Sequence, residues 1–160
     1  MSLSRLLGII GCVTLAGCGF QLQGAFTSPA EMERTYVATS DQHSRFYRAL
    51  RSALETSGVQ LVDNAAAATA TFRIAYDETD QRVLSVSARN VPTEYEVYYT
   101  IEYALDGAEK SLLEYQTLTL TRDYTYDSTL VLGKAREEEL LREAIVADLV
   151  RIVLKQISTL

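Results

Sequence analysis

The sequence has no tryptophan, two cysteines and a single histidine, His43. With one histidine and no second one to join it, a Ser-His-Asp triad, a Cys-His pair and the common zinc sites are hard to build. His43 lies beside an expected helix start, which is typical of a polar neighbour of a helix cap. A glycine-rich phosphate loop is also missing. The sequence therefore predicts no catalytic residue, no metal site and no cofactor.

Positive charge is in short supply as well. The chain has 15 Lys and Arg residues against 21 Asp and Glu residues, so its formal net charge is −6. Nucleic-acid binding needs a basic footprint, so this balance argues against a nucleic-acid partner. An anionic lipid could be bound only through local basic residues.

No apolar run at the N-terminus is long enough to cross a bilayer, which takes about 20 residues. Arg5 is followed by an apolar stretch, Leu6 to Ala16, that ends in small residues and Cys18. This is the layout of a secretory signal peptide. We therefore expect residues 1–17 to be removed, and the loss of Arg5 makes the chain more negative.

The residues Leu15-Ala16-Gly17-Cys18 resemble the lipobox of bacterial lipoproteins, in which a peptidase cuts before a lipid-modified cysteine. The triplet ending at Cys12 also fits loosely, but it shortens the apolar segment, so Cys18 is preferred. A lipid anchor with more than one chain holds a protein stably on a membrane. Because Gly19 rather than aspartate follows Cys18, the resemblance implies an outer-membrane lipoprotein on the periplasmic side.

The rest of the chain divides into a tether and one domain. Residues 18–33 have little periodicity and read as a lipidated tether, whereas residues 34–160 show no repeat or second boundary. Residues 34–39 predict a first strand. In residues 44–58 apolar residues recur every four positions, which predicts an amphipathic helix capped by Asp41 or Ser44 and ended by Gly58.

The middle of the chain is rich in expected strands. Residues 70–76 alternate, a further short strand is expected at 83–88, and residues 94–105 alternate over twelve positions, which a helix cannot explain. Asp106-Gly107 predicts a turn into an antiparallel partner at 111–124. Residues 134–158 carry one apolar helical face. The expected fold is α+β, with two helices packed on one face of a mostly antiparallel sheet of four strands or slightly more.

Four blocks in this order resemble the LptE family of lipopolysaccharide-assembly lipoproteins. They are "CGFQLQG" at 18–24, "SRFYRALRSALETSGVQLVD" at 44–63, "ARNVPTEYEVYYTIEY" at 88–103 and "LVLGKAREEELLREAIVADLVRIVLKQI" at 130–157. Gln21 and Gln23 depart from the His and Arg that members often have, and the polar tail of some members is missing after Leu160.

The resemblance implies a plug inside the lumen of the outer-membrane β-barrel LptD, in a one-to-one pair that inserts lipopolysaccharide into the outer leaflet. In this family basic residues are implicated in lipopolysaccharide binding at the positions of Arg89 and Lys134. A guanidinium in a turn can reach phosphate with paired donors, and a helix start favours anions. Each could equally be an ordinary solvated charge.

Ten tyrosines suit a plug, because a barrel interior is polar and a tyrosine offers both area and a hydrogen-bonding tip. We expect Tyr98, Tyr124 and Tyr126 to point outward, with Asn90 and Pro92 as further barrel-interface candidates. Most tyrosines could instead be core residues, and that reading is preferred for Tyr95, Tyr99 and Tyr103.

Two other functions remain open. One is a structural lipoprotein that links the outer membrane to the cell wall or to other envelope proteins, and what co-purifies with the protein would separate it from a plug. The other is a glycan-processing enzyme that uses two carboxylates. The acidic run Glu137 to Glu139 does not favour it, because acidic residues in the first turns of a helix complement the helix dipole.

Overall fold

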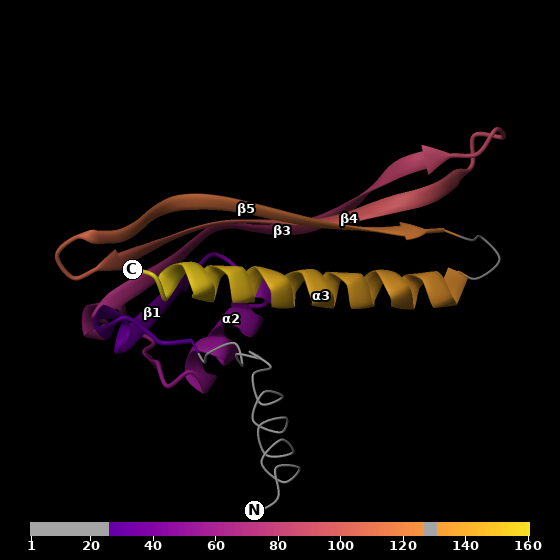
Figure 1. Ribbon diagram of the computed structural model, residues 1–160. Coiled ribbons are helices and arrows are strands. Elements are labelled where there is room, and N and C mark those ends of the chain that lie inside the picture. The colour runs from indigo at the N-terminus through magenta and orange to yellow at the C-terminus, as the bar shows by residue number, and fades with distance from the viewer. Residues whose placement is uncertain (1–25, 127–130) are drawn as a thin grey trace, which may run out of the picture.

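The computed structural model describes residues 26–126 and 131–160. Cys18, the signal peptide and most of the tether lie outside the described residues. The elements run in the order η2 (Ala30–Met32), β1 (Arg34–Thr39), α2 (Arg45–Thr56), β2 (Gln60–Leu61), η3 (Ala65–Ala67), β3 (Ala70–Val86), β4 (Pro92–Gly107), β5 (Ser111–Thr125) and α3 (Val131–Ile157). Figure 1 shows a long sheet with α3 running beneath its length and α2 beneath one end.

The sheet is mixed, and its strand order is β2-β1-β3-β4-β5. β1 pairs in parallel with β2 and β3, whereas β3, β4 and β5 form an antiparallel meander. The five described strands confirm the expected mostly antiparallel sheet. The extra member is the two-residue strand β2, which follows α2 and lies beside β1.

β3 is longer than predicted. The two strands expected at 70–76 and 83–88 are one continuous strand, Ala70–Val86, so the prediction of a separate second strand is wrong. The residues between them, Asp77 to Gln81, are polar on both faces and hide the period-two pattern. A bulge between Ile74 and Tyr76 shifts the register and keeps the strand paired with β4.

Ser44, one of the two residues predicted to cap the first helix, is the N-cap of α2. The Ser44 hydroxyl accepts a hydrogen bond from the Tyr47 amide at 3.0 Å, while Asp41 accepts one from the His43 amide. At the other end Gly58 has a φ of 85°, and the Val59 amide donates to the Leu54 carbonyl at 3.1 Å. Because a left-handed φ costs glycine little, this residue ends the helix where the sequence predicted.

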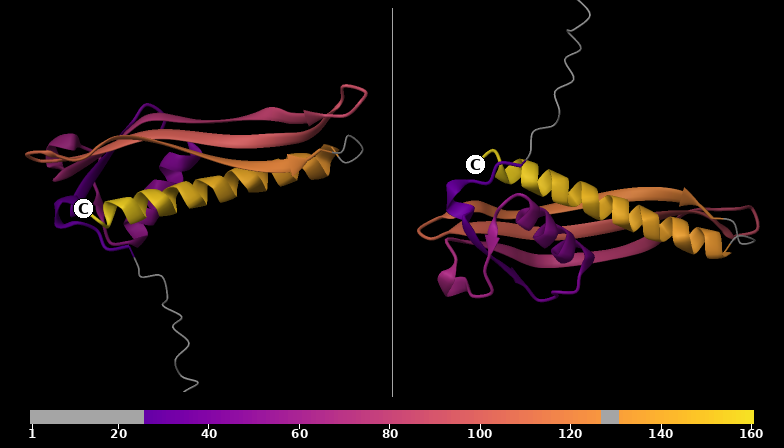
Figure 2. Two further views of the ribbon diagram at one scale, coloured as in Figure 1. Left: turned by 45° about the horizontal axis from the view of Figure 1, so that its top comes forward. Right: turned by 90° about the horizontal axis from the view of Figure 1, so that it is seen from below.

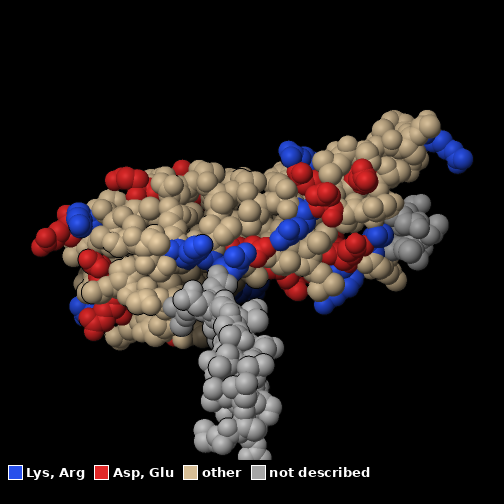
Figure 3. All heavy atoms as spheres, viewed as in Figure 1, with Lys and Arg blue, Asp and Glu red and all other residues tan. Residues whose placement is uncertain are grey.

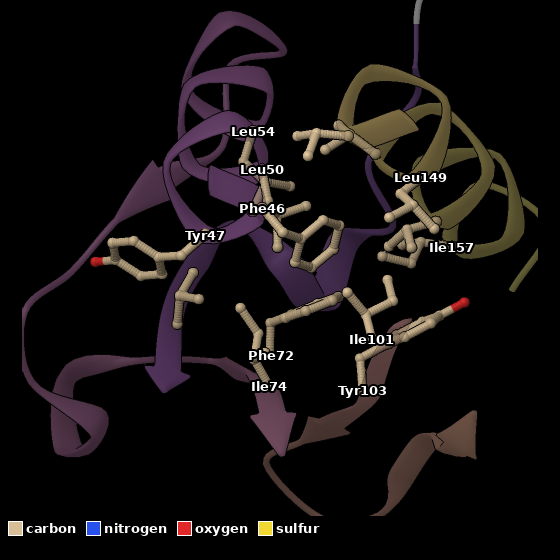
Figure 4. Packing of buried hydrophobic residues seen from close by; sticks show 14 of the residues in the cluster. Phe46, Tyr47, Leu50, Leu54, Phe72, Ile74, Ile101, Tyr103, Leu149 and Ile157 are labelled. Carbon is tan, nitrogen blue, oxygen red and sulfur yellow. The ribbon is translucent and has the colours of Figure 1, made fainter. Parts of the chain in front are cut away.

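The two described α-helices lie on the same face of the sheet, and no other described element covers the opposite face (Figure 2). The core fills the space between the sheet and the helices. Figure 4 shows Phe46, Leu50 and Leu54 of α2 facing Phe72 and Ile101 of the sheet and Leu149 and Ile157 of α3. These side chains are fully buried. Among the described residues, no helix combines the length and the apolar character that a membrane span requires.

β4 contributes one row of buried side chains to the core. From Val97 to Leu105 every second residue of this strand is buried, namely Val97, Tyr99, Ile101, Tyr103 and Leu105. The alternate residues Tyr98, Thr100 and Glu102 are more exposed. This confirms the predicted alternation. Tyr103 stacks on Phe72 with ring centroids 5.6 Å apart, so two of the tyrosines expected in the core, Tyr99 and Tyr103, are found there.

Candidate functional site

The turn between β3 and β4 forms the tip of a long hairpin. The Ser87 amide donates to the Val91 carbonyl at 2.8 Å, and Asn90 adopts a φ of 61°. Asparagine tolerates this left-handed conformation better than most residues, which explains its place in a short hairpin loop. Arg89 precedes it and is exposed. Figure 3 shows a basic side chain projecting at this tip.

Lys134 lies in the first turn of α3, which begins at Val131, three residues before the predicted start. Its ammonium group is 2.7 Å from an oxygen of the Glu137 carboxylate, and 17% of its side chain is exposed. Lys134 is therefore partly covered and already paired on its own helix, whereas Arg89 has no ion-pair partner among the described residues.

Arg89 and Lys134 belong to elements that meet the solvent at one end of the molecule. In both figures the β3–β4 hairpin tip and the start of α3 lie at the same end, with the hairpin projecting further (Figures 1 and 2). We call this the distal end. It also carries exposed apolar side chains, which are Val83, Leu84, Val86 and Val91 of the hairpin and Leu132 of α3. The distal end thus combines basic groups with uncovered apolar surface.

The prediction that Tyr124 points outward is wrong. Only 7% of Tyr124 is exposed, and its ring stacks on Tyr95 at a centroid distance of 5.8 Å. Its hydroxyl lies 3.1 Å from the Gln81 amide oxygen and 3.3 Å from a Glu138 oxygen. Glu138 comes from α3, which covers β5 here, and sequence alone did not place α3 over this strand.

The other interface candidates lie at or near the surface. Tyr126 is half-buried with its ring edge-on to Tyr95 at 5.3 Å. Tyr98 lies on the sheet face opposite the helices, where the Arg82 guanidinium is 5.7 Å from its ring centroid. Pro92 is half-buried opposite Val86 at the start of β4, and Asn90 is exposed in the turn.

A polar cluster at the start of α2 was missed by sequence reasoning. The Tyr99 hydroxyl donates to Asp77 at 2.6 Å and accepts from the Phe46 amide at 3.3 Å, and the Ser44 hydroxyl donates to the second Asp77 oxygen. Burial raises the pKa of Tyr99 above its ordinary value. Asp77 gave no signal because it lies in an aperiodic polar run. Since each group is bonded within the chain, the cluster fixes α2 to the sheet.

Within residues 26–126 and 131–160, no group of three His, Cys, Asp or Glu side chains is arranged to hold a metal ion. The distal end carries two kinds of side chain that can bind a ligand. An exposed guanidinium donates paired hydrogen bonds to phosphate, and adjacent apolar side chains can contact the acyl part of an amphiphile.

Proteins similar to this chain are found in other bacteria. A chain from Yersinia pestis, "LPS-assembly lipoprotein LptE", is 26% identical over 158 residues, which is 98% of this chain and 75% of the relative. The solution structure of "uncharacterized lipoprotein B" from Nitrosomonas europaea matches with a TM-score of 0.73 and 29% identity, covering 88% of this chain and 90% of that one. The "rare lipoprotein B" of Shewanella oneidensis shares the fold, with a TM-score of 0.68 and 24% identity over 79% of this chain and 94% of that one.

The match to a family model spans the described fold. Residues 32–157 match the family described as "LptE: Lipopolysaccharide-assembly", from η2 to the last residue of α3. The matched family is one of assembly proteins and not of enzymes, which confirms the prediction of a non-catalytic protein. The chain belongs to the LptE family of lipopolysaccharide-assembly lipoproteins.

Proposed function

We propose that the chain is an outer-membrane lipoprotein, lipidated at Cys18 after removal of residues 1–17 and joined to its domain, residues 34–160, by the tether 18–33. It acts on the periplasmic side as the plug and assembly partner of the LptD barrel, one to one, within the barrel lumen. It binds lipopolysaccharide at its distal end through Arg89 and Lys134. The observation that carries the proposal is the family match over residues 32–157.

The chemistry of the distal end supports a ligand that is both anionic and apolar. Arg89 is exposed at the hairpin tip, and Val86 and Val91 flank it with about half of each side chain exposed. Leu132, at 89% exposure, lies near Lys134 along α3. Lipopolysaccharide presents phosphates beside acyl chains. A phosphate near Lys134 would have to displace the Glu137 carboxylate, because that carboxylate forms an ion pair with the Lys134 ammonium group.

The distribution of polar groups supports the plug. A barrel lumen offers polar walls, so a plug must keep its own apolar core and present polar side chains outward. The core here is shared by the sheet and both described helices, and the uncovered sheet face carries hydroxyl and carboxylate groups.

Charge reversal at the distal end tests ligand binding. We expect Arg89→Glu combined with Lys134→Glu to lower binding of lipopolysaccharide by at least about tenfold, since two attractive charges become repulsive. Binding is measured with the purified chain and lipopolysaccharide in detergent. The matched control is Lys110→Glu with Lys155→Glu, which makes the same charge change at exposed lysines of the opposite end.

The control variant separates the effect of the position of the charges from the effect of the net charge of the chain. If both double variants bind equally well, the distal end is not the ligand site. The LptD partnership is tested separately by extracting outer membranes in detergent and identifying what co-purifies with the lipidated chain. A large barrel in one-to-one ratio supports the plug, whereas peptidoglycan-associated proteins without a barrel would favour the structural linker.

A further inference from the structure

The face of the sheet turned away from the helices has no cover within the described residues (Figure 2). We call it the open sheet face. The register of β3, β4 and β5 places its residues in cross-strand rows, because side chains alternate between faces along each strand. These rows are Tyr76–Glu102–Thr117, Glu78–Thr100–Thr119, Asp80–Tyr98–Thr121 and Arg82–Glu96–Asp123.

Contacts within the rows confirm that these side chains share one face. The hydroxyls of Thr100 and Thr119 lie 2.9 Å apart, and the Arg82 guanidinium covers the Tyr98 ring. The Tyr76 hydroxyl donates to Glu78 at 2.7 Å. The open sheet face is thus a surface of hydroxyl, phenol and carboxylate groups, in which Tyr76 is 43% exposed.

Charge in these four rows of the open sheet face is one-sided. The four rows hold five carboxylates, Glu78, Asp80, Glu96, Glu102 and Asp123, against the one guanidinium of Arg82. Arg82 is paired with Glu96. Asp80, Glu102 and Asp123 have no basic partner within 4 Å among the described residues. The excess negative charge of these rows is therefore not neutralised by the described residues, and a partner that docks on this face would have to neutralise it.

The negative charge and the hydroxyl groups of the open sheet face limit which kind of partner can dock on it. Phosphate groups would be repelled, so the face is unsuited to the anionic ligand of the distal end. A second copy of the same face would bring like charges together. A protein surface with Arg and Lys side chains and hydrogen-bond donors complements both the carboxylates and the hydroxyl rows.

We propose that the open sheet face is the surface that docks against the inner wall of the barrel, and that this part of the wall is basic. The inference rests on the proposed plug function and adds to it the face, the residues and the partner's chemistry. Tyr98 lies at the centre of this face, and Asp80 and Thr121 flank it on the neighbouring strands.

Neutralisation of the face tests the inference. The triple variant Asp80→Asn, Glu102→Gln and Asp123→Asn removes three charges with little change in shape. Lipidated wild-type and variant chains are expressed in the native envelope, and the barrel that co-purifies in detergent is quantified. We expect about tenfold less barrel with the variant, because several charge pairs are lost together. Raised salt should lower the wild-type yield in the same way.

A matched control separates this face from net charge. Glu33→Gln, Glu109→Gln and Glu143→Gln remove the same charge at exposed sites outside the open sheet face and should leave the yield unchanged. The single variant Asp123→Arg, at an exposed strand position, gives a second measurement should the triple variant fold poorly. Lipopolysaccharide binding by the triple variant should match the wild type.

The outcomes distinguish the two proposals. Equal barrel recovery by the wild type and both face variants overturns the inference and leaves the plug function standing. A wild-type chain that brings down no barrel overturns the plug function and this inference with it. Loss of lipopolysaccharide binding by the triple variant also overturns the inference, because the face would then serve the ligand.

Discussion

The phenol of Tyr124 lies between β3 and the first half of α3, within hydrogen-bond distance of Gln81 and Glu138. Burial first, and the nearby Glu138 carboxylate second, raise the pKa of Tyr124 from 10.0 to about 12. Both effects disfavour the phenolate. At the scale of single residues, a side chain that looked like a surface hydroxyl is part of the core.

The raised pKa of Tyr124 predicts how stability changes in alkali. A group whose pKa is raised by folding contributes stability that is fully present below pH 10 and is lost as the pH rises towards about 12. We expect Tyr124→Phe to lower the free energy of unfolding at neutral pH by about 1 kcal/mol, because one hydrogen bond is lost. The variant should then lose less stability than the wild type between pH 10 and about pH 12.

Denaturant unfolding at several pH values measures both effects. Tyr99 and Tyr103 also have raised pKa values, so the wild type and the variant will both weaken in alkali, and the informative quantity is their difference. Parallel stability curves for the two proteins would show that Tyr124 ionises as an ordinary exposed tyrosine.

At the scale of elements, the two halves of the single helix α3 pack differently. Its second half buries six apolar side chains, Ile145, Val146, Leu149, Val150, Val153 and Ile157. Its described first half, from residue 132 to 144, has no fully buried side chain and is joined to the rest by polar contacts such as the Arg45–Glu139 ion pair between α2 and α3. Apolar packing therefore anchors the second half much more firmly than the first.

The two halves predict different costs for the same substitution. Leu149→Ala should lower the free energy of unfolding by about 2–5 kcal/mol, because it leaves a cavity in a fully packed site. Leu141→Ala, at a half-buried leucine of the same helix, should cost about 1 kcal/mol. Urea unfolding of both variants compares them. Equal losses would contradict the division of α3.

At the scale of the whole molecule, apolar surface is unevenly exposed. Six of the nine large apolar side chains exposed in the described residues, Val83, Leu84, Val86, Val91, Leu132 and Leu140, belong to the distal hairpin or to the first half of α3. Scattered exposed apolar side chains are normal, but their gathering at one end supports the proposed ligand site at the distal end. Most of the core lies in the opposite half of the molecule.

This separation predicts that the distal hairpin can be changed without unfolding the protein. Val86→Ser with Val91→Ser should shift the free energy of unfolding by no more than about 0.5 kcal/mol and should reduce self-association of the purified chain. Val97→Ser, at a fully buried position of β4, is the control and should destabilise strongly. A marked loss of stability in the double variant would mean that the hairpin contributes to the core.

Much of the fold was predictable because it depends on local pattern. The alternation in β4 predicted its buried side, and the four-residue spacing and Gly58 predicted α2 and its end. The antiparallel partner β5 was predicted as well, but the turn expected at Asp106-Gly107 lies at residues 108–110, because both residues belong to β4. Of the site, Arg89 was placed in a turn and Lys134 near a helix start, as the structure has them. What was missed, such as the middle of β3 and the Asp77 cluster, depends on residues far apart in the chain.

The sequence by itself determined which residues become strand or helix and which side of each is apolar, because these follow from the 2.0 and 3.6 residue periods of the backbone. Only the tertiary structure decided that β3 runs unbroken beside β4, that α3 covers Tyr124, and that the Arg89 hairpin and the Lys134 helix turn share one end. These outcomes depend on strand register and helix placement. Both are set by packing of the whole core, which no local stretch of sequence contains.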